Sequence, residues 1–164
     1  MKKNKERTIR PEIRFVLIFL ILIGAFYLVY YNTIDYFGFL KAIIANALSF
    51  TLSLVGIKAI VHGEDILLGS FSLRIIEECT AVFASLIYVS CVLAYPANLK
   101  SKLIGIGFGI PVIQAVNIIR LVVLSITGLY YPGIFEFVHT YIWQSIFIIF
   151  VIAVWLVWLE RFVK

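Results

Sequence analysis

Three side chains able to do chemistry stand out in a sequence that offers few others: Cys79, Arg120 and His139. Cys79 follows two glutamates, Arg120 interrupts a long uncharged stretch, and His139 comes shortly after a Pro-Gly turn. A cysteine thiolate is a nucleophile, a histidine can serve as general base and acid, and a cation can stabilise a thiolate or an oxyanion. The three residue types together are typical of nucleophilic acyl transfer.

Each of these side chains also has a purely structural explanation. A free cysteine is most often a small apolar filler, an arginine near a helix end can reach lipid headgroups, and a histidine at the interface can face those headgroups. The second cysteine, Cys91, lies about 18 Å further along a helix, too far from Cys79 for a disulfide. Two cysteines and two histidines without ligand spacing predict no metal site.

The composition places this chemistry in a membrane. Of 164 residues, 63% are hydrophobic and 14% are charged, whereas a soluble domain has about 45–50% apolar and about 25% charged residues. Four stretches with at most one charge are long enough to cross the bilayer: 15–34, 79–99, 103–135 and 137–159. The basic residues cluster before the first of them, which is a topology signal and does not predict binding to nucleic acid.

We therefore predict an all-α membrane protein, a multi-pass bundle of four to six helices. A basic cytoplasmic segment, 1–14, precedes a single membrane-embedded catalytic domain, 15–164. Residues 60–77 combine a turn cluster with apolar and polar alternation, which predicts a small extracytoplasmic β-hairpin. Residues 42–57 are only marginally long enough to span, so they could span, re-enter or lie in the interface.

The distribution of lysine and arginine predicts the sidedness. If residues 42–57 do not cross, ten basic residues lie inside and three lie outside, and if they cross, the division is eight and five. The positive-inside rule favours the first arrangement. Both termini are then cytoplasmic, and Cys79, Arg120 and His139 all lie at the extracytoplasmic boundary of the cell membrane.

Two further residues are expected to support this site. Asn117 lies three residues before Arg120 on the same helix face, and we expect it to help hold the guanidinium. Glu78 could pair with Arg120. Cys79 is expected in the first turn of a helix at the wet outer boundary, where the helix dipole favours a thiolate.

The sequence Glu78-Cys79-Thr80-Ala81, followed by Asn117-Ile-Ile-Arg120 and by His139 ahead of a final helix, resembles the exosortase/archaeosortase family. The family's pattern is a Glu-Cys-type motif with Ser or Thr and a small residue, then Asn-x-x-Arg, then His. The resemblance covers roughly residues 40–160. Ala81 stands where the family usually has glycine, and no glycine closely follows His139.

The resemblance implies a cysteine transpeptidase that needs no cofactor and acts on exported proteins carrying a C-terminal sorting signal. Cys79 would be the nucleophile that forms a thioester, Arg120 the stabiliser of thiolate or oxyanion, and His139 the acid and base. The new C-terminus would pass to a membrane lipid or another acceptor. Two alternatives are a non-enzymatic scaffold or transporter subunit, with Arg120 in a structural ion pair with Glu77 or Glu78, and an acyl-transfer enzyme acting on a lipid thioester.

Overall fold

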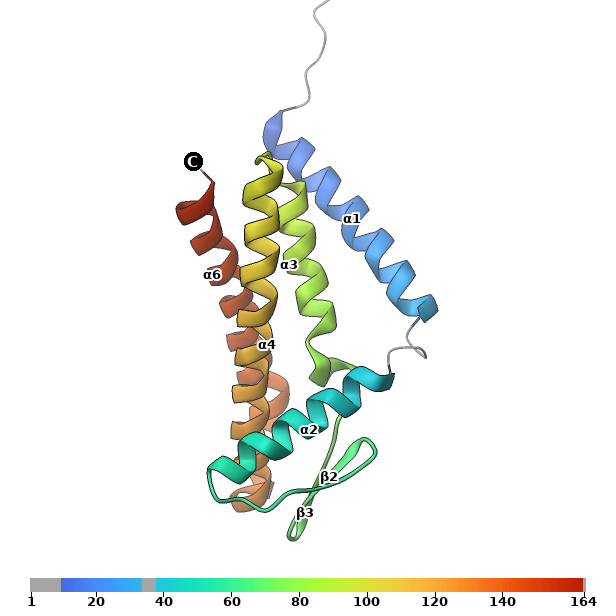
Figure 1. The fold of residues 1–164 in the computed structure, drawn as a ribbon, viewed down its shortest axis with the longest axis vertical. Coiled ribbons are helices and arrows are strands. Elements are labelled where there is room, and N and C mark those ends of the chain that lie inside the picture. The colour runs from blue at the N-terminus through green and yellow to red at the C-terminus, as the bar shows by residue number, and fades with distance from the viewer. Residues whose placement is uncertain (1–9, 34–37, 164) are drawn as a thin grey trace, which may run out of the picture.

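The computed structural model describes residues 10–33 and 38–163 and shows a helical bundle with a small sheet at one end (Figure 1). The helices are α1 (Pro11–Thr33), α2 (Gly38–Leu54), α3 (Val82–Ala94), α4 (Leu99–Tyr130), the single turn α5 (Phe135–Phe137) and α6 (Gln144–Phe162). The strands are β1 (Ile60–His62), β2 (Asp65–Leu68) and β3 (Phe71–Arg74). The predicted multi-pass bundle with a small β element is confirmed.

Three helical stretches are long and apolar enough to cross a membrane: Pro11–Thr33, Leu99–Tyr130 and Pro132–Phe162. The second predicted span, 79–99, is wrong in its extent, because its helix α3 has only 13 residues, or about 20 Å. A short 3-10 turn, η2 (Glu77–Thr80), precedes α3, and Ala81 between them has a left-handed backbone with φ 53° and ψ 18°. An α-helix cannot continue through a left-handed residue, so the Cys79 turn is separated from α3.

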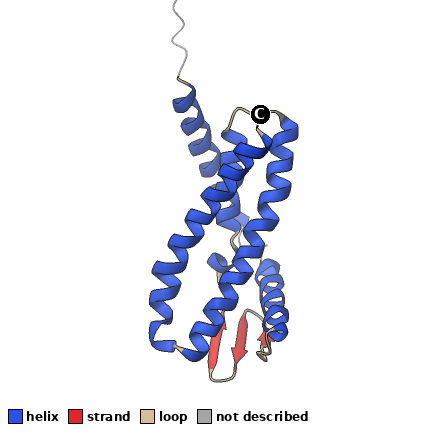
Figure 2. Ribbon diagram, turned by 90° about the vertical axis from the view of Figure 1, so that its left-hand side faces the viewer, coloured by secondary structure: helices blue, strands red, loops and turns tan. Residues whose placement is uncertain are grey.

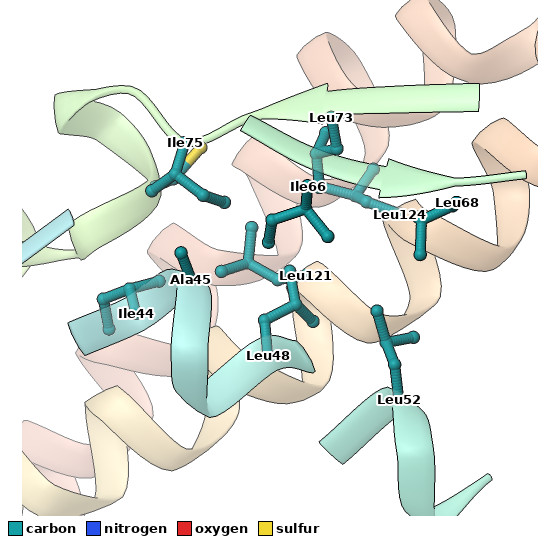
Figure 3. Close-up of a cluster of buried hydrophobic side chains, with 11 residues drawn as sticks. Ile44, Ala45, Leu48, Leu52, Ile66, Leu68, Leu73, Ile75, Leu121 and Leu124 are labelled. Carbon is teal, nitrogen blue, oxygen red and sulfur yellow. The ribbon is translucent and has the colours of Figure 1, made fainter. Parts of the chain in front are cut away.

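Helix α2 contains residues 42–54 of the ambiguous segment 42–57, and it lies across the lower end of the bundle (Figure 1). Its buried face packs against the sheet and against α4, where the side chains point toward one another (Figure 3). This apolar cluster consists of Ile44, Ala45, Leu48, Leu52, Ile66, Leu68, Leu73, Ile75, Cys79, Leu121 and Leu124. Burial of these side chains fixes α2 over the site-bearing part of α4.

The sheet has one strand more than the predicted hairpin. Its antiparallel order is β1-β2-β3, with Val61 opposite Ile66 and Ile66 opposite Leu73. Strand β1 is only three residues long, which is too short for apolar and polar alternation to reveal it. On the exposed side, Arg74 donates two hydrogen bonds to the Asp65 carboxylate, at 2.8 and 3.0 Å.

Helix α4 carries three glycines against which aromatic rings from other elements pack directly. A methyl group at any of these glycines would overlap with a ring. The pairs are Gly105 with Trp158 of α6, Gly109 with Tyr88 of α3, and Gly128 with Phe71 of β3. The Tyr88 hydroxyl also donates to the Gly105 carbonyl oxygen at 2.9 Å, so close approach and hydrogen bonding act together.

The two ends of the bundle differ in what they carry. The start of α1, the connection between α3 and α4 and the end of α6 lie at one end, and α2 and the sheet lie at the other (Figures 1 and 2). Most of the predicted basic segment 1–14 lies outside the described residues, and residues 11–14 belong to α1. The cytoplasmic position of the termini stays a prediction.

Candidate active site

The predicted site residues come from three elements. Cys79 lies in η2, Asn117 and Arg120 lie on α4, and His139 lies in a π-helical segment, η4 (Val138–Trp143), that leads into α6. The positive charge of Arg120 lies close enough to both the Cys79 thiol and the His139 ring to act on them electrostatically. The fold therefore gathers side chains that are 60 residues apart in the sequence.

Asn117 has a different partner from the one expected. Its side-chain amide is fully buried and donates a hydrogen bond to the backbone carbonyl oxygen of Cys79 at 2.6 Å. Its Oδ1 atom has no hydrogen-bond partner among the described residues. Asn117 thus holds the backbone of the Cys79 turn, and the guanidinium of Arg120 is held in another way.

A second amide on α4 extends this anchorage. Gln114, one turn before Asn117, donates from Nε2 to the Thr80 carbonyl oxygen at 3.1 Å. The Thr80 hydroxyl in turn donates to the Glu77 carbonyl oxygen at 2.6 Å. Two consecutive carbonyls of η2 are therefore tied to one face of α4, and the left-handed Ala81 follows directly. This conformation favours glycine, which gives a physical reason for the glycine that the family usually has there.

Arg120 is buried without an ion pair. Only 7% of the residue is exposed, its guanidinium lies over the Phe147 ring at 5.4 Å, and Nε has no hydrogen-bond partner in the described part of the chain. Within residues 10–33 and 38–163 no salt bridge reaches it: Glu77 pairs with Lys41 at 2.7 Å, and Glu78 is exposed and acts only through its charge. A buried guanidinium with an unused donor is suited to bind an anion that develops during a reaction.

The Cys79 thiol is not on a wet surface, which corrects the expected position. The residue is 3% exposed and belongs to the apolar cluster under α2. It also precedes Ala81 and so lies outside the first turn of α3, where a helix dipole would act. Burial disfavours the thiolate, whereas a backbone hydrogen bond at Ile76 and, after it, the Arg120 charge favour it. Arg120 is thus the one charged side chain of the described residues that stabilises the thiolate.

His139 is partly exposed, and its ring stacks on Phe135 with centroids 5.7 Å apart and an interplanar angle of 11°. Its π-helical backbone is rare, and such segments frequently occur at functional sites. Nothing in the sequence around residues 138–143 predicts this backbone. Phe147 and Gln114 were also missed by the sequence analysis. Phe147 is one of many apolar residues on its helix, so nothing in the sequence distinguishes it. Gln114 lies one turn before Asn117, and this spacing was the available signal.

An apolar cavity of about 420 Å³ lies beside the Cys79 turn. It opens between α2, α4 and the start of α3, and only Thr80 and Gln114 add polar groups to its wall. The remaining lining residues are Leu40, Ile43, Ile44, Ala47, Val82, Ala115 and Ile118. Such a cavity is suited to an apolar segment that must be held next to Cys79.

The fold and the site together define a class: a multi-pass helical membrane protein with a buried cysteine, an unpaired buried arginine and a histidine gathered near one end of its bundle. The family model described as transmembrane exosortase matches residues 10–142, a range that includes Cys79, Asn117, Arg120 and His139. The chain therefore belongs to the transmembrane exosortase family, which supports a sortase-like processing role at the membrane. Comparison with curated proteins gives no match, and comparison with solved structures gives none.

Proposed function

We propose that the chain is a cysteine transpeptidase that cleaves the C-terminal sorting signal of exported proteins at the outer face of the membrane. The observation that carries this proposal is the buried, unpaired Arg120 beside a cysteine whose backbone is fixed by Asn117. The scaffold alternative requires a structural ion pair at Arg120, and no salt bridge among the described residues reaches Arg120. Family membership supports the same chemistry.

The reaction needs three roles. The Cys79 thiolate attacks the carbonyl carbon of the scissile peptide bond, and the guanidinium of Arg120 binds the oxyanion that forms. His139 in its protonated form gives a proton to the leaving amine, so that the C–N bond breaks and a thioester remains on Cys79. His139 then takes a proton from the acceptor, whose nucleophilic atom attacks the thioester, so that the C–S bond breaks and the Cys79 thiolate and protonated His139 are restored.

The cavity beside the Cys79 turn supports an apolar substrate. Its walls come mainly from α2 and α4, and Thr80, the residue directly after the proposed nucleophile, also lines it. Either the apolar part of the sorting signal or the acyl chain of an acceptor lipid would gain from burial there. The substrate's short motif would then lie near Cys79, and its apolar segment would extend along α2 and α4.

Replacing His139 by alanine should slow the proposed reaction by about 10²–10⁴-fold, because general acid–base catalysis is typically worth that much. The assay is cleavage of a purified substrate bearing a sorting signal by enzyme in liposomes, with mass spectrometry of the new C-terminus to separate transfer from hydrolysis. The wild-type pH–rate profile should contain a limb that the variant lacks. His62→Ala, an exposed change in β1, is the matched control and should keep both rate and limb.

The site should face the extracytoplasmic side. Reporter domains fused after Gly63 and after Gly133, both in exposed turns at the site end of the chain, should report outside in intact cells. The reason is the excess of basic residues at the opposite end of the bundle. A cytoplasmic signal at Gly63 would contradict the proposed arrangement, since the Cys79 turn directly follows the sheet that contains this glycine.

A further inference from the structure

Lys41 of α2 binds two carboxylates from segments far from it in the sequence. Its ammonium lies 3.0 Å from the Glu64 carboxylate, in the turn between β1 and β2, and 2.7 Å from the Glu77 carboxylate in η2. The Lys41 side chain is only 16% exposed, whereas the two glutamates are 47% and 38% exposed. One cation thus joins α2, the sheet and the Cys79 turn.

Both partners of Lys41 are attached to the chain around Cys79. The Glu77 carbonyl oxygen accepts from the Thr80 hydroxyl, and the Glu64 carbonyl oxygen accepts from the Ile75 N–H at 2.8 Å. The hydrogen bond from Lys41 holds the pKa of the Glu77 carboxyl below its usual range. The two carboxylates raise the pKa of Lys41 in turn. Lys41 and Glu77 are therefore both charged at neutral pH.

We propose that Lys41 is a positioning residue for the Cys79 turn. It neutralises Glu77 and fixes η2 against α2, so that the positive charge of Arg120 can stabilise the Cys79 thiolate. This inference rests on the proposed role of Cys79 and adds a second cation to the site. It assigns to α2, which carries none of the motif residues, a direct part in the electrostatics of the nucleophile.

The neighbouring charges give the sign of the effect. Arg120 from α4 acts favourably on the Cys79 thiolate, and Glu78 and Glu77 from its own turn act against it. Two titratable groups from other elements lie near these charges. His139 in η4 is within electrostatic reach of Arg120 and Glu78. Tyr30 in α1 is within electrostatic reach of Glu77, Glu78 and Lys41. Loss of Lys41 leaves the negative charge of Glu77 uncompensated, which makes the Cys79 thiolate harder to form.

The test is a double-mutant cycle on thiol reactivity. Methyl methanethiosulfonate is small and neutral, and a thiolate that attacks it gains a methylthio group through a new S–S bond as methanesulfinate leaves. Its rate of reaction with Cys79 is measured against pH by mass spectrometry, on full-length protein in nanodiscs carrying Cys91→Ser. The variants are Lys41→Met, Glu77→Gln, both together, and Lys41→Arg. Lys58→Met, an exposed lysine beyond α2, is the control.

We expect Lys41→Met to raise the pH midpoint by about one unit, which lowers the rate at neutral pH about tenfold. Glu77→Gln should react at least as fast as the parent, and the double variant should recover most of the lost rate. Lys41→Arg and Lys58→Met should resemble the parent. A purely structural role predicts that the double variant is as slow as Lys41→Met, which would overturn the proposal, as would the absence of any modification in every variant.

The reagent reports on the thiol without any sorting substrate, so failure of this proposal and failure of the proposed function can be told apart. If the cycle gives the expected pattern but Cys79→Ala still processes substrate, the electrostatic role of Lys41 stands and the transpeptidase mechanism does not. If processing needs Cys79 but the cycle shows no recovery, the mechanism stands and Lys41 has only a structural part.

Discussion

Cys79→Ala should abolish cleavage of a sorting substrate, whereas Cys91→Ser should leave cleavage largely intact. Loss of the nucleophile removes the thioester route altogether. Cys91 lies within α3, which the left-handed Ala81 separates from the Cys79 turn, and its side chain is half-buried. Co-expression of each variant with a tagged substrate and an immunoblot for the shortened product is the measurement. An inactive Cys91→Ser together with an active Cys79→Ala would refute the assignment.

Burial changes what chemical labelling of these cysteines should show. An impermeant maleimide should modify a cysteine at a wet boundary readily, but Cys79 is only 3% exposed beneath α2. We therefore expect a bulky reagent to react slowly with Cys79 in the free enzyme, and a small one to react faster. The burial also implies that substrate must displace part of the wall around the thiol before attack.

Arg120→Lys should be nearly as damaging as Arg120→Ala, with both variants slowed by at least about 100-fold, the usual effect of losing an oxyanion donor. The planar guanidinium lies over the Phe147 ring and keeps Nε free. A lysine ammonium has neither the planar fork nor the flat face, so it cannot reproduce that position. Initial rates of substrate cleavage, normalised to folded protein by size-exclusion chromatography, provide the measurement.

The lysine variant is also the control for folding, because it keeps a positive charge and most of the side-chain volume. If the Lys variant worked at near-normal rates, Arg120 would be no more than a generic positive charge, and the oxyanion role would have to move to other donors. If only the Ala variant failed to fold, the Lys variant would still decide the question.

The gathering of Cys79, Arg120 and His139 could be predicted from the sequence because membrane helices have a fixed rise and span a fixed thickness. The distribution of basic residues predicts the same end of the bundle for all three, and the structure brings them together at one end. The start of α3 could not be predicted in this way, because the hydropathy of an alanine does not reveal a left-handed backbone conformation.

The contacts within the site were beyond the reach of pattern reasoning for a different reason. Asn117 and Arg120 share a helix face, which predicted that they hold one another, but the amide instead meets a backbone carbonyl delivered by η2. The contacts of Lys41 with Glu64 and Glu77 likewise depend on how α2 lies across the bundle. Such contacts join segments whose relative position only the assembled fold defines.

The glycine and aromatic contacts along α4 have a consequence for the alignment of the site. Lipid tails are as apolar as leucine, so the hydrophobic effect does little to choose one helix register over another within the bilayer. Gly109 lies eight residues before Asn117, and Gly128 lies eight residues after Arg120, about 12 Å away in each direction. A slip of α4 by one turn would bring Leu124 opposite Phe71 in one direction and Ile113 opposite Tyr88 in the other. Either slip would therefore place a side chain against one of these two rings. The height at which Arg120 meets the Cys79 turn is thus determined by steric fit well away from the reacting atoms.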